Sequence, residues 1–468
     1  MAPPEVRVDD GTGPTPASAE ESIPAETPPG PDGLPVVGNA LSLVRSPRAF
    51  YEEMSEYGDV VSYSLPGMEF CTVLHPDLIE RVLVTDHQRF TKWGFEDLGG
   101  EFAPEGLLLT DGDQWRRQRT TIQNAFTLDR IQGYADVMAQ SATELVESWD
   151  DGEEIALNRE FSKLTLDVLT RSLFDIQLDD EAAIVTEFAE AVNDRGSVDS
   201  LSTFVPMWVP TPRNRRYRRV LSEFRSFVTS LIDERRGRAE AYDDLLSLLL
   251  TAEDDDGNTM SETELRDQMV TFLFAGHETT SLALTYTGLE LATHDDVRER
   301  LDAEHDAVLG GTAPRPADLH DLTYTDRVIR ESLRLYPPAF IIFRKAAEDV
   351  ALGGYRIPEG TRVTLPQFHV HTDDRWYDAP EQFDPDRWTQ EFEESLPEYA
   401  YFPFGGGPRH CIGMRFAMLE LRTILPILTQ AAEFDLLSSP DPELDMATTL
   451  QPAEDVRARV TLSDASSP

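Results

Sequence analysis

The chain has 468 residues, and 40% of them are hydrophobic, which is enough for a large buried core. Its 86 acidic and 41 basic residues give a formal net charge of −45 at pH 7, a field that repels nucleic acid and anionic membranes. No stretch approaches the roughly 20 apolar residues that cross a bilayer. We therefore expect a cytoplasmic protein that spans no membrane and binds no nucleic acid.

The basic residues are unusual in kind as well as in number, because Lys92, Lys163 and Lys345 are the only lysines. In dilute salt, a large excess of like charge opposes the compact state. In molar salt the Debye length falls to about 3 Å and most of that repulsion is screened. The composition therefore suggests the salt-rich cytosol of an extreme halophile, and the alternative is a merely acidic protein.

Along the chain, residues 1–32 are rich in Pro, Glu, Asp, Thr and Ser, which is typical of disorder. The runs GDVVSYSL (58–65) and FCTVLH (70–75) flank Pro66-Gly67 and predict a hairpin. From about Pro76 to Leu335 the pattern is mostly helical, and strand signals return at Val363–Leu365. We predict a single domain over residues 33–460, mainly α with small β-sheets (α+β), and a disordered tail at 461–468.

One helix of the middle region differs from the others. Ser261 and Glu264 form a capping-box pattern, and the run that follows, MVTFLFAGHETTSLALTYTGLELA, is apolar on most sides, as in buried helices. Its centre, residues 275–280 (AGHETT), contains a glycine that costs a helix interior about 1 kcal/mol relative to alanine. Two interpretations stay open: a kinked core helix with satisfied polar groups, or a helix opened at Gly276 to face a ligand.

The stretch FPFGGGPRHCIG (402–413) surrounds one of only two cysteines with glycines, which permit positive φ and close backbone approach. The helical periodicity after Gly413 places Cys411 at or just before a helix N-terminus. There the helix dipole and free N–H groups favour a thiolate, and Arg409 adds positive charge. An isolated cysteine is otherwise a small buried hydrophobe, which would need no such loop.

Five residues of this stretch fit the pattern F-x-x-G-x-R-x-C-x-G, and the stretch resembles the haem-binding loop of the cytochrome P-450 family. Further motifs occur in the family's order: Trp115 with Arg119, the AGHETT centre, Glu331 with Arg334 (E-x-x-R), and Arg387 in FDPDRW (383–388). The resemblance covers roughly residues 30–455. It implies the cytochrome P-450 fold, in which a helix-rich and a β-rich region enclose haem b.

The resemblance also implies roles for individual residues. It makes Cys411 the iron ligand, and Phe404 and Ala275 neighbours of the haem. It gives the haem propionates the partners Trp115, Arg119, Arg344 and Arg409. Glu331, Arg334 and Arg387 would form a buried structural triad, whereas an i,i+3 ion pair on a helix is otherwise most often solvated.

Thiolate ligation favours O–O cleavage at haem iron. By resemblance, Gly276, Glu278 and Thr279 form the oxygen site, in which Thr279 holds oxygen by a hydrogen bond and Glu278 helps to bring in protons. This implies a monooxygenase that inserts one atom of O₂ into a lipophilic substrate, a hydroxylation. The alternatives are a haem-based gas sensor without turnover, and a peroxide-driven peroxygenase, which would be expected to lack the acid–alcohol pair.

About 55 residues follow Cys411, too few for a flavin or iron–sulfur domain. Electrons from NAD(P)H are therefore expected to arrive through ferredoxin and its reductase, or a flavodoxin-type donor, and we expect a monomer. The resemblance assigns an apolar substrate pocket to Phe95, Leu107, Leu108, Phe274, Phe340, Ile341 and Leu450. His410 has no assigned role. The run Arg213–Arg219 is either a solvated helix face or a pocket rim that attracts a carboxylate.

Overall fold

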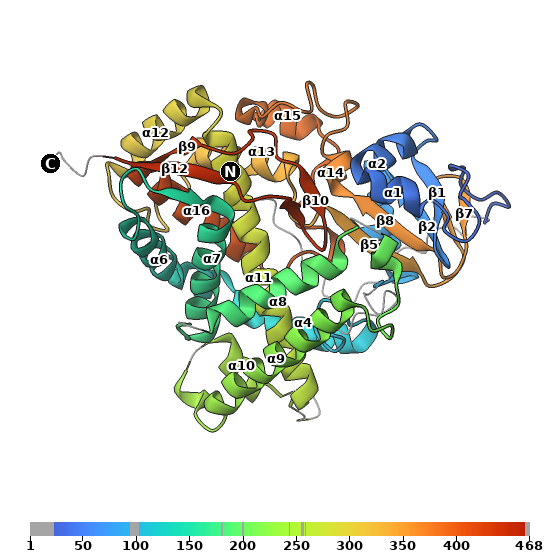
Figure 1. Ribbon diagram of the computed structural model, residues 1–468, viewed down its shortest axis with the longest axis horizontal. Helices are drawn as coiled ribbons and strands as arrows, with labels where there is room; N and C mark the ends of the chain where they lie inside the picture. The colour runs from blue at the N-terminus through green and yellow to red at the C-terminus, as the bar shows by residue number, and fades with distance from the viewer. Residues whose placement is uncertain are drawn as a thin grey trace.

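The computed structural model describes residues 23–93, 103–178, 181–198, 201–242, 244–253, 257 and 259–463. A helix-rich region and a β-rich region lie side by side, with α11 (Glu262–Leu291) running through the middle (Figure 1). The predicted mainly α fold with small β-sheets is confirmed. Within the described ranges, no helix has both the length and the apolar character needed to cross a bilayer.

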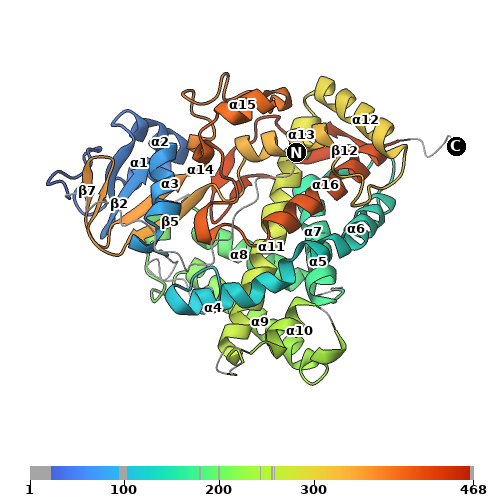
Figure 2. The same ribbon diagram turned by 180° about the vertical axis from the view of Figure 1, so that it is seen from behind.

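The helix-rich region packs its longest helices around α11. Its members are α4 (Gly112–Gln123), α5 (Leu128–Gly133), α6 (Ala135–Glu147), α7 (Leu157–Phe174), α8 (Ala182–Gly196), α9 (Pro212–Arg235), α10 (Leu245–Thr251), α12 (Asp295–Leu309), α13 (Thr323–Leu335) and α16 (Met414–Ala431). α7, α13 and α16 all contact α11. The view from behind shows α16 beside α5 and α6 (Figure 2).

The β-rich region is built on a five-stranded sheet in the order β1-β2-β8-β5-β3. Its strands are β1 (Val60–Leu65), β2 (Met68–Val73), β3 (Phe90–Thr91), β5 (Ile341–Ala346) and β8 (Arg362–Pro366). β1 and β2 form the predicted hairpin, with Gly67 at φ +74° in its turn. β8, which contains the predicted strand signal at 363–365, pairs parallel with β2.

The remaining strands form three smaller sheets: β4 (Glu154–Ala156) with β12 (Arg457–Leu462) and β9 (Ala432–Leu436); β6 (Val350–Leu352) with β7 (Tyr355–Ile357); and the hairpin of β10 (Leu444–Met446) and β11 (Leu450–Pro452). Short helices complete the β-rich side: α1 (Ala40–Arg45), α2 (Pro47–Ser55), α3 (Pro76–Glu80), α14 (Gln367–Val370) and α15 (Gln390–Ser395). The β10–β11 hairpin matters most here, because it reaches α11 at the site described below.

α11 begins with the predicted capping box, since the side chains of Ser261 and Glu264 each bind the other's backbone N–H. The helix then continues without interruption for 30 residues. A Cβ built on Gly276 would lie 2.7 Å from Cδ1 of Leu169 in α7. The interpretation of a helix opened at Gly276 is therefore wrong: the missing side chain allows α7 and α11 to pack closely.

Two described parts of the predicted terminal segments, residues 26–30 and 461–462, make backbone hydrogen bonds to the rest of the chain. The carbonyl of Pro29 accepts a hydrogen bond from the Ser62 N–H at 2.8 Å, and the carbonyl of Glu26 accepts one from the Arg356 N–H at 2.7 Å. The first contact forms because β1 is the edge strand of the main sheet, and the second is made to β7. At the other end, Thr461 and Leu462, which lie just beyond the predicted domain end, pair with β9 inside β12.

The basic run 213–219 lies in the first turns of α9, which Thr211 caps. Arg213, Arg216 and Arg219 recur every three residues and face α8. They form ion pairs there with Asp194 at 3.5 Å, Glu190 at 3.2 Å and Glu187 at 3.4 Å. This face of the run thus joins α9 to α8, and it is neither a purely solvated face nor a free cationic rim.

Candidate active site

The loop before α16 has the geometry its glycines predict. Gly407 has φ +63°, and a Cβ there would clash with the carbonyl oxygen of Leu83. The Cys411 N–H donates to the carbonyl of Phe404 at 2.9 Å, which closes the loop on itself. Cys411 lies three residues before the first residue of α16, as predicted, and its side chain is exposed.

Two opposing effects act on the Cys411 thiol. Neighbouring protein atoms desolvate the sulfur, which raises the pKa of the thiol although the side chain is exposed. Hydrogen bonds from the backbone N–H groups of Gly413 and Met414, and the charge of Arg119, lower the pKa by a smaller amount. These N–H groups and Arg119 act in the predicted direction, and the expectation that the loop favours a thiolate stays a prediction. A positive ion bound to the sulfur would favour the charged form further.

Arg409 extends from the same loop to the beginning of α4. Its Cζ lies 4.4 Å from the centroid of the Trp115 ring, so the guanidinium rests on the indole. It donates to the carbonyl of Thr110 at 2.9 Å and forms an ion pair with Asp111. The structure thus brings together Trp115 and Arg409, two of the residues predicted to hold a haem carboxylate.

Two further cations lie near Arg409. Arg344 of β5 is buried, and its pKa is lowered to about 10 by desolvation and by repulsion from Arg409. The pKa of Lys92 is lowered to about 7, again mainly by desolvation and then by repulsion from Arg344 and Arg409. Asp111 is the carboxylate that acts on all three. Among the residues that the structure describes, this single carboxylate leaves the cation cluster with unbalanced positive charge.

His410, which had no assigned role, binds Arg119. Arg119 donates to the carbonyl of His410 at 3.0 Å, and its Nη2 lies 3.2 Å from the His410 Nε2. The Nδ1 lies 2.9 Å from the carbonyl of Gly407 and donates to it, so Nε2 is the acceptor. Burial lowers the pKa of His410, which favours this neutral tautomer. His410 thereby connects α4 to the cysteine loop.

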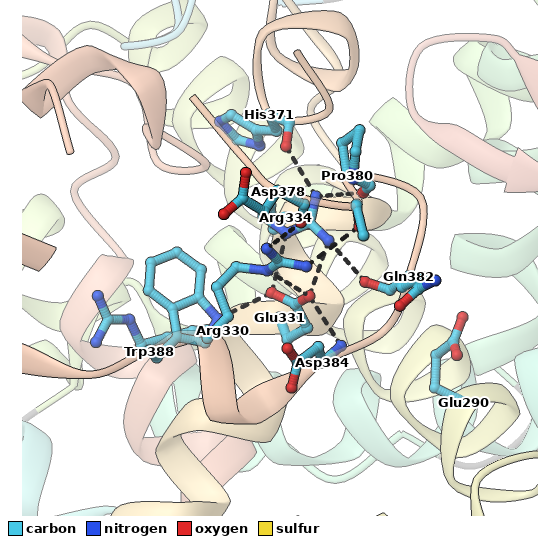
Figure 3. Close-up of polar contacts among 12 residues, drawn as sticks. Glu290, Arg330, Glu331, Arg334, His371, Asp378, Pro380, Gln382, Asp384 and Trp388 are labelled. Atoms are coloured by element: carbon cyan, nitrogen blue, oxygen red, sulfur yellow. Dashed lines mark hydrogen bonds and ion pairs between the residues drawn. The ribbon is translucent and has the colours of Figure 1, made fainter. Parts of the chain in front are cut away.

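The three residues of the predicted triad contact one another: Glu331 and Arg334 are fully buried and bind each other (Figure 3), and the partly buried Arg387 joins them. Arg334 binds both oxygens of Glu331, at 2.8 and 2.9 Å, and Arg387 binds Oε1 at 3.2 Å. The remaining guanidinium N–H groups of Arg334 donate to the carbonyls of His371, Pro380 and Gln382. The network fastens α13 to the chain that leads to the cysteine loop.

Trp388, which directly follows Arg387, also binds the acid of the triad. Its indole N–H donates to Oε2 of Glu331 at 2.9 Å. The guanidinium of Arg330 lies over the Trp388 ring, with its Cζ 4.2 Å from the ring centroid. The carboxylate of Glu331 therefore has a neutral donor in addition to its two arginines.

Glu278, in the centre of α11, is buried and has no ionic partner among its hydrogen bonds. Its Oε1 accepts from the Asn193 amide, from the Thr449 hydroxyl at 3.0 Å and from the Gln451 amide at 2.5 Å. Its Oε2 is buried without a hydrogen-bond partner in the described part of the chain. Burial raises the pKa of Glu278 to about 7, although these three donors lower it.

The neighbouring alcohol, Thr279, donates to the carbonyl of Ala275 at 3.0 Å within α11. Thr280 donates to the carbonyl of Gly276 at 3.4 Å. Both hydroxyls of the AGHETT centre therefore donate within the helix, and Thr280 also contacts Glu420 of α16. The roles of Gly276, Glu278 and Thr279 in an oxygen site stay predictions.

The predicted pocket residues lie in different places. Phe340 and Ile341 line an apolar cavity, whose wall also contains the rings of Tyr51, Tyr63, Phe70, Trp93, Phe204 and Phe343. Leu107 and Phe274 are buried, and Leu108 is exposed. The carbonyl of Leu450 accepts from the Tyr286 hydroxyl at 3.0 Å. Phe95 lies outside the described residues.

A family model for cytochrome P-450 matches residues 28–457. The chain belongs to the cytochrome P-450 family. It is 35% identical to cyclooctatin synthase of Streptomyces melanosporofaciens, over 83% of this chain and 86% of that one. It is 34% identical to pentalenene oxygenase of Streptomyces avermitilis, over 92% and 96% of the two chains.

Among solved structures, the retinoic acid bound cyanobacterial CYP120A1 superposes with a TM-score of 0.82 at 26% identity, covering 94% of this chain and 100% of that one. The family implies haem, and the residues present fit this group: an exposed cysteine thiol precedes a helix, and the nearby cation cluster has more positive charge than Asp111 balances. Two propionates would supply the missing negative charge. The protein is thus an enzyme, a cytochrome P-450 monooxygenase.

Proposed function

We propose that this monooxygenase hydroxylates an uncharged, terpenoid-like lipophile, using electrons that a separate ferredoxin and its reductase deliver from NAD(P)H. The observation that supports the substrate class is the apolar cavity. Its described lining comes from α2, β1, β2, β5, the end of α8 and the β10–β11 hairpin, and none of these lining residues carries a charge. A fatty acid would place its carboxylate among uncharged lining residues.

The cavity encloses about 130 Å³, less than the roughly 300 Å³ at which ligand pockets usually begin. We infer that it is the entrance part of a larger site that continues toward α11. Two observations on relatives agree with a lipophilic substrate: one relative is named for the oxidation of pentalenene, and the solved neighbour holds retinoic acid.

When bound, the haem with a thiolate ligand would supply the activation of O₂. Cys411 would be its ligand, and Phe404 and Ala275 would be in contact with the group. Lys92, Trp115, Arg119, Arg344 and Arg409 would hold the propionates, of which Lys92 is an addition to the residues predicted from motifs. Glu331, Arg334 and Arg387 would keep the loop in place.

On α11, Thr279 would hold a proton toward the reacting oxygen through its hydroxyl. Glu278 would replace that proton from its carboxyl group, since an acid with an adjacent alcohol can relay protons. The lack of charged groups along the cavity would keep the substrate oriented by shape and apolar contact alone.

A screen of the purified haem protein against terpenoids, steroids and fatty acids, read as the substrate-induced spin-state shift, tests the substrate class. We expect uncharged terpenoids to give shifts at concentrations at least tenfold lower than fatty acids of similar size. Tighter binding of the fatty acids would contradict the proposal. Ile341→Trp should weaken the binding of bulky ligands and leave that of small ligands unchanged, because Ile341 lines the cavity.

The reaction class is tested separately. Reduced protein with carbon monoxide should show the haem-thiolate Soret band, and Cys411→Ser should lose it. Product formed with NAD(P)H, ferredoxin and reductase would exclude a gas sensor without turnover. Product formed with hydrogen peroxide alone, and retained in Thr279→Ala, would instead favour a peroxygenase.

A further inference from the structure

Three neutral donors from two distant parts of the chain bind one oxygen of a buried acid. Asn193 belongs to α8, Gln451 belongs to β11, and Thr449 directly precedes β11. All three donate to Oε1 of Glu278, while Oε2 is buried without a partner in the described part of the chain. A buried acid usually has a cation or uses both oxygens, so the arrangement calls for an explanation.

Charged groups on the surrounding elements are bound elsewhere. Asp445 of β10 accepts from the Ser197 hydroxyl at 2.7 Å, and Arg195 of α8 donates to the carbonyls of Thr203 and Val205. On α7, Arg171 and Asp167 pair with each other at 3.1 Å. None of these groups has a hydrogen bond or ion pair to Glu278 within the described residues.

The other titratable groups near the centre of α11 are also turned away from Glu278. The His277 ring lies against the Leu273 carbonyl, with Nδ1 2.6 Å from that oxygen. Glu420 of α16 interacts with Thr280. The environment of Glu278 is therefore set by Asn193, Thr449 and Gln451.

Neutral donors and cations have different consequences for a buried carboxyl. A cation would hold the charged form over the whole physiological range, and complete burial without donors would hold the neutral form. Amide donors lie between these limits, and a group that titrates near the working pH can both hold and release a proton. The geometry also separates the two oxygens, since the donors occupy only Oε1.

We propose that Asn193 and Gln451 are positioning residues for the oxygenation reaction: they bind Oε1 of Glu278 and reserve Oε2 as the atom that takes up and releases the proton. The inference rests on the proposed role of Glu278 in proton supply. It extends that role to two residues that no sequence motif marks, 85 residues before and 173 residues after the acid.

The same two segments line the apolar cavity. Gly196 at the end of α8 and Met446, Ala447 and Thr448 of the β10–β11 hairpin are part of its wall. A Cβ built on Gly196 would come 3.1 Å from the Thr448 N, so the two segments touch. A substrate in the cavity would therefore contact the segments that carry both donors. This contact would connect occupancy of the cavity with the position of Glu278.

Asn193→Leu and Gln451→Met test the proposal, because each replaces an amide donor with an apolar side chain of similar shape. Loss of a donor destabilises the carboxylate, so the falling limb of the pH profile of turnover should move about one unit toward higher pH. We expect the intensity of the carbon monoxide band and the size of the substrate-induced spin-state shift to stay within twofold of the wild-type values. Gln390→Met, which removes an amide from the exposed α15, is the matched control and should change none of these readouts.

Glu278→Gln provides the reference for both variants. Its turnover should fall about 100-fold, and its pH profile should lack the falling limb. Adding Asn193→Leu to it should have no further effect on the pH profile. A limb that stays at the wild-type pH in both donor variants would overturn the positioning role. If Glu278→Gln itself keeps wild-type turnover and its limb, the proposed role of Glu278 fails instead.

Discussion

Two buried glutamates in this protein have opposite surroundings. Glu331 uses both oxygens, which bind two arginines, the Trp388 indole and the Asp384 N–H. Glu278 uses one oxygen, and all its donors are neutral. The first arrangement surrounds a carboxylate with cationic donors and connects segments of the fold, whereas the second leaves one oxygen without a donor among the described residues. Both acids are buried, and the charge of their donors is what distinguishes them.

The largest predicted effect concerns the surface that surrounds both sites. With a net charge of −45, we expect the folded state to be lost in about 10 mM salt, where the Debye length is about 30 Å, and to be stable in molar potassium chloride. Circular dichroism across a salt titration measures this. Equal stability at both ends of the titration would refute a halophilic origin. The difference between wild type and a Glu331 variant should stay constant, because salt does not screen the buried network.

The next largest effect is expected at Glu331. Glu331→Gln leaves two buried arginines without their carboxylate, which should cost about 3–5 kcal/mol in the free energy of unfolding. Guanidinium denaturation followed by tryptophan fluorescence checks the value. Glu393→Gln is the matched control, because Glu393 pairs with Arg330 at the surface, and its loss should cost less than about 1 kcal/mol. Similar costs for the two variants would show that the network does not stabilise the fold.

Glu278→Gln should change the free energy of unfolding in the opposite direction to Glu331→Gln at neutral pH. Burial raises the pKa of Glu278 to about 7, so between pH 4.5 and 7 the folded state binds more protons than the unfolded state, and stability falls as pH rises. Relative to Glu278→Gln, the wild type should therefore lose up to about 3 kcal/mol as pH rises through this interval. Unfolding curves of both proteins at several pH values measure the difference. A difference that is independent of pH would contradict a shifted Glu278.

The smallest effect is expected for Trp388→Phe, which keeps the ring and removes one donor to Glu331. Because Arg334 still binds Oε2 at 2.9 Å, the loss should be about 1–2 kcal/mol. Denaturation compared with the Glu331→Gln protein gives the measurement, and the double variant should be no less stable than Glu331→Gln alone. A loss that adds fully in the double variant would mean that the indole acts through packing.

Local signals in the sequence predicted much of the fold and of the cysteine side of the site. The capping box, the β1–β2 hairpin and the position of Cys411 before α16 depend on neighbouring residues, and the structure confirms them. The contacts of Glu278 could not be predicted, because Asn193 and Gln451 meet it only through tertiary packing. The same holds for Gly276, whose missing side chain is explained by Leu169 on another helix.

The contact between residues 26–30 and β1 has a consequence for solubility. β1 is the outermost strand of the main sheet, and an uncovered strand edge is a template on which further chains can add. The carbonyl of Pro29 occupies the Ser62 N–H, and Gly30 lies so close to the Ser62 backbone that a side chain would not fit. A protein that begins after residue 31 would expose this edge, and we expect it to self-associate into aggregates while its catalytic centre is still intact.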